Sequence, residues 1–359
     1  MRIILNMASE VQCLQLQNRH QKVVVGSHHF FLLTERGQLY ACGTNGCGQL
    51  GLGDDKERHT FTHVPFPEAI RTVVAGSHHS FLLTTTGQLY ACGSNGNGQL
   101  GLGDGENRHN FTHVPFSEPV LTVVAGGQCS FLITKSGQLY VCGYNSHGQM
   151  GLRDGTNHYS FTLIPFPESV LTVVVAETHS FLLTATGQLY ACGSNDNGQL
   201  GLGDGEDRYS FTRVPFMEPI QTVVAGWDHS LLLTATGQLY ACGSNDNGQL
   251  GLGDDKNRYT FTHIPFSEPI LTVAAGGNHS FFLTAKGQLY GCGDNDDENR
   301  HSFTYVPSPE SALEVVVGDF HSFLFTTSGH LYICGYDGYE RFGLKDRKNR
   351  HHFTHVTFP

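Results

Sequence analysis

Histidines, which could ligate a metal ion or move protons, recur at one position along this chain. They close a short loop that reads Gly-x-x-His in most copies, at intervals of about 50 residues. The set consists of His29, His79, His179, His229, His279 and His321, with Cys129 in the third copy. The ligands of one metal ion must converge within a few ångströms, whereas residues repeated at this interval belong to separate structural units. We therefore predict structural histidines, each hydrogen-bonded within its own loop, and no metal site.

The cysteines follow the same periodicity. Seven of the ten share one place in successive copies, namely Cys42, Cys92, Cys142, Cys192, Cys242, Cys292 and Cys334. Equivalent positions in neighbouring units are expected to lie beyond the ~7 Å limit for a disulfide. We predict buried, reduced thiols, which are typical of a cytosolic protein.

The remaining motifs do not indicate bond-making catalysis. Serine, histidine and aspartate are abundant, but their periodic repetition explains them without a catalytic triad. The glycine-rich residues 98–103 do not form a phosphate loop, because no Gly-Lys-Ser/Thr follows and no helix is expected there. We expect neither catalytic residues nor a cofactor.

A 50-residue repeat must position all of these side chains. Residues 182–204 recur letter for letter at 232–254. The anchor Gly-Gln/His-Leu-Tyr-x-Cys-Gly begins at Gly37, Gly87, Gly137, Gly187, Gly237, Gly287 and Gly329. The last step is 42 residues because the sixth copy lacks an Asn-Gly-Gln-Leu-Gly-Leu-Gly-Asp loop. We expect a notch in the rim where that loop is missing.

Each copy predicts four short strands. In the second copy they are residues 72–76, 80–84, 88–93 and 111–114, and the first three are apolar on both faces. A sheet that is apolar on both faces has to lie between neighbouring sheets, as in radially packed blades. We predict an all-β fold, a seven-bladed β-propeller of four-stranded antiparallel blades. The blades cover about residues 23–66, 72–116, 122–166, 172–216, 222–266, 272–308 and 314–358.

Residues 1–22 precede the repeats. Val11 to Leu14 align with the fourth strand of a blade, so this segment is expected to pair with the last blade and close the ring. Met7, Val11 and Leu14 suit a short helix equally well. The sequence leaves both alternatives open.

Charge and hydropathy restrict the partners. The chain has 21 Lys and Arg against 32 Asp and Glu, a net charge of −11, whereas nucleic-acid binding needs a basic footprint. The apolar run Ile3-Ile4-Leu5 is too short for a secretory signal, and no stretch is long enough to span a membrane. We expect a cytoplasmic monomer that binds no nucleic acid.

The repeat resembles that of the regulator of chromosome condensation family. From Ala75 to Asp104 it reads A-G-S-H-H-S-F-L-L-T-T-T-G-Q-L-Y-A-C-G-S-N-G-N-G-Q-L-G-L-G-D, and the resemblance extends over about residues 23–359. It implies a seven-bladed propeller. The founding member is a nucleotide exchange factor for the small GTPase Ran, while other members are inhibitors, photoreceptors or recognition domains. The fold is therefore a firmer expectation than any one function.

Positions at which one copy departs from the others predict the binding surface. Except in the first two copies, which match, the two x residues of the Gly-x-x-His loops differ between copies, and they include the only tryptophan, Trp227, beside carboxylates. Aromatic residues on loops over a rigid scaffold are typical of a protein-binding hot spot. The alternative is that Trp227 covers the mouth of the central channel. The predicted binding residues are His28, His78, Glu177, Trp227, Asp228, Asp319 and Phe320, with Tyr336, Tyr339 and Arg341 from the irregular third loop of the last copy.

Two functions follow from the resemblance. In the founding member, acidic and histidine residues of these loops engage the GTPase, and the matching positions here are Asp319, Asp228, His28 and His78. The first hypothesis is a Ran-like GTPase as partner, with stimulated nucleotide exchange as the activity. The second is a non-catalytic adaptor or inhibitor that uses the same loop face, because the constant period leaves no room for the founding member's inserted hairpin wedge. The near-identity of the copies also suggests a bacterial effector that is secreted into a host cytosol.

Overall fold

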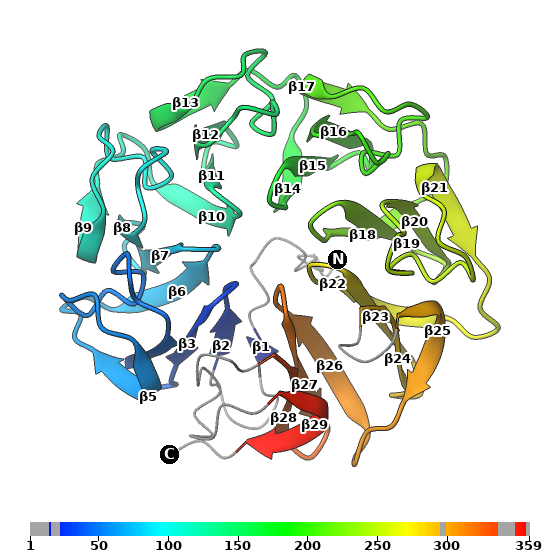
Figure 1. Cartoon of the computed structure of the whole chain (residues 1–359). Helices are drawn as coiled ribbons and strands as arrows, with labels where there is room; N and C mark the ends of the chain where they lie inside the picture. The colour runs from blue at the N-terminus through cyan, green and yellow to red at the C-terminus, as the bar shows by residue number, and fades with distance from the viewer. Residues whose placement is uncertain (1–13, 16–21, 295–298, 337–348, 357–359) are drawn as a thin grey trace.

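The chain closes into a ring of sheets. The computed structural model describes residues 14–15, 22–294, 299–336 and 349–356. Seven sheets radiate from a central axis and follow one another in chain order (Figure 1). The predicted all-β, seven-bladed propeller is confirmed. Every regular element of the described residues is a strand, so none of their segments is a helix long and apolar enough to cross a membrane.

Each blade consists of four consecutive strands. Blade one contains β2 (Lys22–Val25), β3 (His29–Leu33), β4 (Leu39–Gly43) and β5 (Arg58–Val64), and blade two contains β6 (Ile70–Ala75), β7 (His79–Thr84), β8 (Leu89–Gly93) and β9 (Arg108–Val114). Blade three contains β10 (Val120–Gly126), β11 (Cys129–Thr134), β12 (Leu139–Gly143) and β13 (His158–Ile164), and blade four contains β14 (Val170–Val175), β15 (His179–Thr184), β16 (Leu189–Gly193) and β17 (Arg208–Arg213).

The remaining three blades repeat this order. Blade five contains β18 (Ile220–Ala225), β19 (His229–Thr234), β20 (Leu239–Gly243) and β21 (Arg258–Ile264), and blade six contains β22 (Ile270–Ala275), β23 (His279–Thr284), β24 (Leu289–Gly293) and β25 (Arg300–Val306). Blade seven contains β26 (Ala312–Val317), β27 (His321–Thr326), β28 (Leu331–Gly335) and β29 (Arg350–Val356).

Within a blade, every strand pairs antiparallel with the next along the chain. In blade two, Val74 lies opposite Phe81, Phe81 opposite Ala91 and Ala91 opposite Thr112. The outer strand β9 begins three residues earlier than the apolar pattern predicts. Its first residues, Arg108 to Asn110, are polar because they lie at the sheet edge, where Asn110 forms a β-bridge to Leu52 of blade one.

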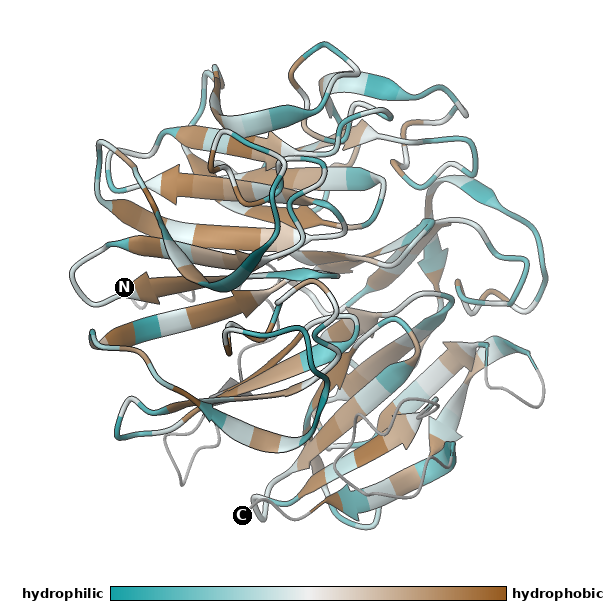
Figure 2. Cartoon of the chain, turned by 60° about the vertical axis from the view of Figure 1, so that its left-hand side comes forward, coloured by the Kyte–Doolittle hydropathy of each residue, from teal (hydrophilic) through white to brown (hydrophobic). Residues whose placement is uncertain are grey.

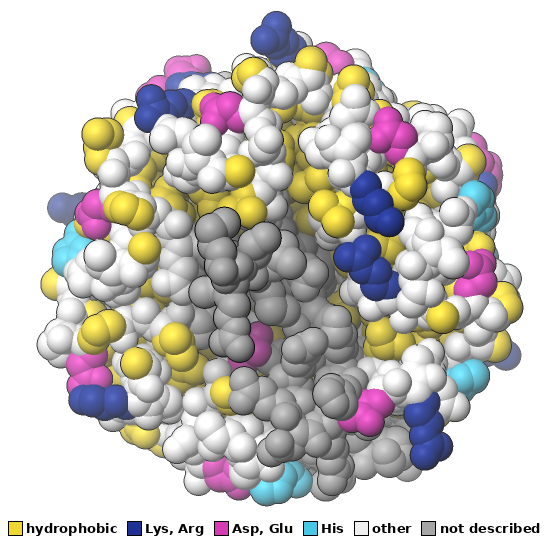
Figure 3. Space-filling view, turned by 180° about the vertical axis from the view of Figure 1, so that it is seen from behind, with side chains coloured by type: hydrophobic (Ala, Val, Ile, Leu, Met, Phe, Trp, Pro, Cys, Tyr) yellow, Lys and Arg dark blue, Asp and Glu magenta, His cyan; other side chains and the backbone are white. Residues whose placement is uncertain are grey.

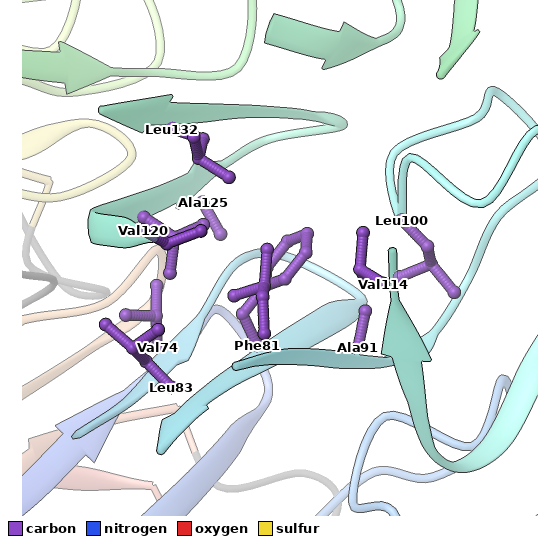
Figure 4. Close-up of a cluster of buried hydrophobic side chains, with 11 residues drawn as sticks. Val74, Phe81, Leu83, Ala91, Leu100, Val114, Val120, Ala125 and Leu132 are labelled. Carbon is purple, nitrogen blue, oxygen red and sulfur yellow. The ribbon is translucent and has the colours of Figure 1, made fainter. Parts of the chain in front are cut away.

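The hydrophobic core lies between the blades. All residues of β7 are buried, so this strand packs against a neighbour on both faces. Figure 4 shows one such interface, in which Phe81 and Leu83 of blade two meet Ala125 and Leu132 of blade three. Figure 2 shows the same arrangement over the whole chain, with hydrophobic inner strands and hydrophilic loops. Burial on both sheet faces is the reason that the strands read as continuous apolar runs.

The first and last blades meet through side chains. Val23, Phe30 and Leu32 of blade one pack against Phe323 and Phe325 of blade seven. The segment from Val11 to Leu14, expected to pair with the last blade, lies outside the described residues except for Leu14. Leu14 belongs to β1 (Leu14–Gln15), which pairs antiparallel with β2 of blade one.

Candidate functional site

The Gly-x-x-His loops converge at one mouth of the central channel. A cavity of about 260 Å³ along the axis is lined by the first variable residue of several loops, among them Ser27, Ser77, Glu177, Trp227 and Asp319. The loops between the third and fourth strands leave from the same side, because Ser94 N donates to His78 O at 2.8 Å. The two sets of loops therefore share one surface, which we call the loop face.

Hydrogen bonds link the loops around the channel mouth. Ser27 Oγ donates to Ser77 Oγ at 3.1 Å, and Ser77 Oγ donates to Glu177 Oε2 at 3.4 Å. Gln128 Nε2 donates to the other oxygen, Glu177 Oε1, at 3.1 Å. Glu177 of blade four thus reaches blades two and three. The sequence showed Glu177 as an outlier, but it gave no sign that serine and glutamine hold both of its oxygens.

Asp319 is the second acid of the channel mouth. Burial raises the pKa of its carboxyl, the polar side chains of Ser27 and Trp227 lower the pKa, and the charge of Glu177 raises it again. Its backbone oxygen accepts from Gly277 N at 3.1 Å. Blades one and five therefore contact the carboxylate, while blade six holds the backbone of the same residue, and protonation of the carboxylate depends on how far water and a partner can reach it.

Four aromatic side chains contact one another in series beside Asp319 at the channel mouth. The rings of Trp227 and Phe320 meet edge to face with centroids 5.0 Å apart, and Phe320 stacks on His28 at 6.1 Å. His28 in turn lies 5.6 Å from His78. Phe320 remains 43% exposed. Trp227 passes over Gly277, where an added Cβ would lie 3.1 Å from the indole ring. We call Trp227, Phe320, His28 and His78 the aromatic cluster.

Asp228 stands apart from this cluster. Its carboxylate accepts a long hydrogen bond from Gln199 Nε2 at 3.4 Å, in the third loop of blade four. Burial raises the pKa of Asp228, the charge of Asp196 raises it further, and His147 lowers it. The two acids proposed to act together therefore occupy different environments, since Asp319 lines the channel and Asp228 faces a neighbouring loop.

A second cavity, of about 520 Å³, lies where blades six, seven and one meet on this face. It occupies the place of the expected notch. Predicted binding residues in its lining are His28, Asp319, Phe320 and Tyr336. The sequence interpretation missed further lining residues, namely Asn278, Phe281, Asp294, Cys334, Arg350 and His351. Tyr339 and Arg341, also predicted to bind the partner, lie outside the described residues.

The sequence matches a known repeat model five times. The model describes the regulator of chromosome condensation (RCC1) repeat and covers residues 36–83, 86–133, 136–183, 186–233 and 236–283. The chain belongs to the RCC1 repeat family. A second RCC1 repeat model matches residues 21–49, 70–99, 120–149, 220–249 and 270–298. The family resemblance seen in the sequence is thereby confirmed.

Three solved structures share the fold of this chain. Human WBSCR16 has a TM-score of 0.80 at 21% identity, covering 90% of this chain and 95% of that one. Yeast RCC1 (Prp20), solved with bound Kap60, has a TM-score of 0.78 at 20% identity, covering 89% and 83%. Prp20p of Saccharomyces cerevisiae, described with its binding to Gsp1p and histones, has a TM-score of 0.77 at 19% identity, covering 96% and 89%.

Among curated proteins, the human and dog X-linked retinitis pigmentosa GTPase regulators match one segment. Each is 51% identical over 41 residues, which are 11% of this chain and 4% of the relative. The chain therefore matches only a small part of these longer proteins, about the length of one RCC1 repeat.

The repeated histidines join neighbouring blades. His79 Nε2 lies 2.8 Å from Ser130 Oγ of the next blade, and the same pair recurs between His29 and Ser80, His179 and Ser230, His229 and Ser280, and His279 and Ser322. Our expectation of a bond within the histidine's own loop was wrong about the partner. The 50-residue period identifies equivalent atoms, but it does not reveal which neighbouring unit they contact.

Burial explains the chemistry of these histidines and of the cysteines. It lowers the pKa of His79, His179 and His229 to about 3 and that of His279 to about 4. It raises the pKa of the buried Cys92 thiol well above its usual range. The described cysteines form no disulfide, and no three of the described His, Cys, Asp and Glu side chains are grouped so that they could hold a metal ion.

The opposite face of the ring and its rim carry mixed charges. In the view of Figure 3, basic, acidic and hydrophobic side chains are interspersed around the ring. At the rim, Arg58 pairs with Asp54 at 2.7 Å, and the same pair recurs in blades two, four and five. These surface pairs contribute little to stability, because water screens the attraction between their charges.

Proposed function

We propose that the loop face binds a small GTPase of the Ran type and promotes the release of its nucleotide. The observation that carries this proposal is the aromatic cluster beside Asp319 at the channel mouth. A partly exposed Trp–Phe pair that borders a half-buried carboxylate has the composition of a protein-binding hot spot. Membership in the RCC1 family supports a GTPase as the partner, as does the likeness in fold to Prp20p, which has been studied for binding to Gsp1p.

Nucleotide release requires binding that differs between the two states of the GTPase. A partner that binds the nucleotide-free form more tightly lowers the affinity for nucleotide by the same factor. Asp319 and Asp228 supply negative charge at two points of the loop face, where they can attract the lysine of the GTPase phosphate loop away from the phosphates. Asp319 would then exchange its contacts with the Ser27 and Trp227 side chains for that lysine.

The exchange activity predicts a specific loss on removal of both acids. The purified chain should speed the release of labelled GDP from Ran, and the double variant Asp228→Ala with Asp319→Ala should abolish that effect. Stopped-flow fluorescence measures the rate. The double variant Asp55→Ala with Asp255→Ala removes two exposed aspartates away from the channel mouth, changes the net charge equally and should retain activity. A release rate that stays unchanged at micromolar wild-type protein excludes exchange on Ran.

A second function, binding without exchange, is favoured by one observation. The acids of the channel mouth already have partners in the free chain, since Glu177 accepts from Ser77 and Gln128. A rigid surface of this kind can bind a GTPase as an adaptor or an inhibitor and leave its nucleotide in place.

Under this alternative, Trp227→Ala should weaken GTPase binding while the nucleotide-release rate stays at its basal value with either protein. Loss of a central tryptophan typically costs 2 kcal/mol or more, which corresponds to about a 30-fold lower affinity. Calorimetry with GDP-loaded and nucleotide-free Ran measures it. Tyr209→Ala removes an exposed aromatic ring from an outer strand and is the matched control. Equal affinity of wild type and Trp227→Ala would place the contact elsewhere.

A further inference from the structure

Glu177 belongs to blade four, but its carboxylate makes its hydrogen bonds in two other blades. Blade three lies between blades two and four in the ring (Figure 1). The Glu177 side chain crosses over blade three, because Ser77 Oγ of blade two donates to Glu177 Oε2 at 3.4 Å. The crossing requires Gly127 in blade three, since an added Cβ there would lie 2.7 Å from Glu177 Oε2 and 2.7 Å from Glu177 Cα. Any side chain at position 127 would displace the carboxylate.

Three side-chain amides connect Glu177 to the rim of the loop face. Gln128 Nε2 donates to Glu177 Oε1 at 3.1 Å, and Asn97 Nδ2 donates to Gln128 Oε1 at 2.6 Å. Asn157 Nδ2 donates to Asn97 Oδ1 at 3.0 Å, and Asn157 Oδ1 accepts from Asn145 N at 3.1 Å. We call Asn157, Asn97 and Gln128 the amide chain. It joins the channel mouth to the third loops of blades two and three, which connect the third and fourth strands of each blade.

The two ends of the amide chain impose the same direction on its hydrogen bonds. The backbone N–H of Asn145 can only donate, and the ionised carboxylate of Glu177 can only accept. Each amide between them accepts with its oxygen on the rim side and donates with its nitrogen on the channel side. Hydrogen bonds that point the same way polarise and strengthen one another. The charge of Glu177 therefore strengthens the bonds that hold Gln128 and Asn97.

This arrangement occurs once in the ring. Pairs of asparagines on the rim recur elsewhere, and Asn257 Nδ2, for example, donates to Asn197 Oδ1 at 3.1 Å. The inward continuation needs a glutamine at the second variable position of one loop and a glutamate at the first variable position of the next. Only blade three has that glutamine, Gln128, and only blade four has that glutamate. The amide chain is thus a feature of this part of the loop face and not of the repeat.

We propose that Glu177 is a positioning residue of the loop face. Its carboxylate holds Gln128, and through Gln128 the third loop of blade two, in the position that the GTPase contacts. The inference rests on the proposed function, because GTPase binding is the property that Glu177 supports. It differs from the expectation drawn from the sequence, in which Glu177 contacts the partner itself. Each oxygen of this carboxylate already accepts a hydrogen bond within the chain.

Exchange of two residue types separates a positioning role from a direct contact. The double variant Gln128→Glu with Glu177→Gln moves the charge by one residue along the chain and keeps a donor and an acceptor in every bond. The new carboxylate at position 128 accepts from Asn97 Nδ2 and from the new amide at position 177. The oxygen of that amide still accepts from Ser77 Oγ. Positioning is therefore restored, whereas a direct contact of the charge with the partner is not.

Calorimetry of the variants with nucleotide-free Ran measures the effect. Glu177→Gln replaces a charged acceptor by a neutral one and should weaken binding about fivefold. Gln128→Glu places two carboxylates side by side and should weaken binding at least about tenfold. The double variant should bind within about twofold of wild type. Glu118→Gln is the matched control, because Glu118 lies on the opposite face and also accepts from a serine, Ser136 Oγ, at 2.6 Å.

The free chain gives a second readout that does not depend on the GTPase. Nuclear magnetic resonance detects the side-chain amide protons of Asn97. Their signals should shift and exchange faster with water in Glu177→Gln, and they should return toward the wild-type values in the double variant. The side-chain amide of Asn197, at the equivalent position of blade four, should keep its signals in all variants.

Two outcomes would overturn the proposal. One is a double variant that binds Ran no better than Glu177→Gln, because the charge at position 177 would then contact the partner directly. The other is an Asn97 side-chain signal that does not respond to Glu177→Gln. Wild-type chain that fails to bind Ran, together with the expected response of Asn97, would remove the GTPase function and support the positioning role of Glu177.

Discussion

Acidification from pH ~7.5 to pH ~5.5 is expected to destabilise the folded ring by about 5 kcal/mol. The cause is the set of buried histidines between the blades. Burial holds the pKa of His79, His179 and His229 at about 3 and that of His279 at about 4, and it lowers the pKa of His29 as well, from a usual value of 6.5. The folded state keeps these side chains neutral, whereas the unfolded chain protonates them.

The sign and the size follow from this difference. A lowered pKa stabilises the folded state fully above pH ~6.5, and that contribution is lost as the pH falls toward ~3. One pH unit below the usual pKa, each histidine costs about 1.4 kcal/mol, or about 7 kcal/mol for the five. Glu314 acts in the opposite direction. Burial raises the pKa of its carboxyl to about 7, so protonation relieves about 2 kcal/mol over the same interval.

Urea denaturation at the two pH values measures the loss, which is comparable with the total stability of many domains. The variant His79→Cys copies the residue that blade three carries at this position, Cys129. It should lower stability near neutral pH, since Ser130 loses its partner, but it should also reduce the pH dependence by one histidine's share. His109→Cys, at an exposed position, is the control. Equal free energies of unfolding at both pH values would contradict the prediction.

Gly93→Ala is expected to destabilise the chain by about 3 kcal/mol. Gly93 ends β8 with a φ of +105°, a region that L side chains rarely adopt. An added Cβ would lie 2.5 Å from the backbone oxygen of His78 and 2.7 Å from the Cα of His79. Backbone atoms at this distance cannot move aside without breaking the bond from Ser94 N to His78 O.

Gly96→Ala is the matched comparison, three residues further along the same loop. No atom lies within 4 Å of a Cβ built there, and its φ is not positive. Thermal or urea unfolding should show a large loss for Gly93→Ala and a change within about 0.5 kcal/mol for Gly96→Ala. Similar losses for both variants would mean that loop flexibility, and not the collision with His78, sets the cost.

The 50-residue period of the sequence was sufficient to predict the fold, because each blade repeats the same arrangement of four strands. The apolar sequences around Phe81 and Cys92 predicted strands that are buried on both faces, and the structure contains these strands. The period could not predict contacts between copies. His79 bonds to Ser130 in the next blade, and Glu177 reaches Ser77 two blades away.

The candidate site was predictable only as a set of irregular residues. Trp227 and Phe320 were identified as outliers, but their contact depends on Gly277, which lets the indole pass over blade six. Asp228 was grouped with Asp319 because both carry a carboxylate on equivalent loops. The structure separates them, since one side chain faces Gln199 and the other lies in the channel. The direction in which each of these side chains points depends on packing against its neighbours, and an alignment of the repeats does not reveal that packing.

Each sheet of this ring is drawn from one uninterrupted stretch of chain, and blades one and seven meet through side chains such as Phe30 and Phe323. A duplication or loss of one whole 50-residue unit therefore leaves every strand ladder intact. The identical sequences of residues 182–204 and 232–254 are expected after a recent duplication of such a unit. A gene of this design can diversify by recombination between whole blades, while the loops at the channel mouth change independently of the scaffold beneath them.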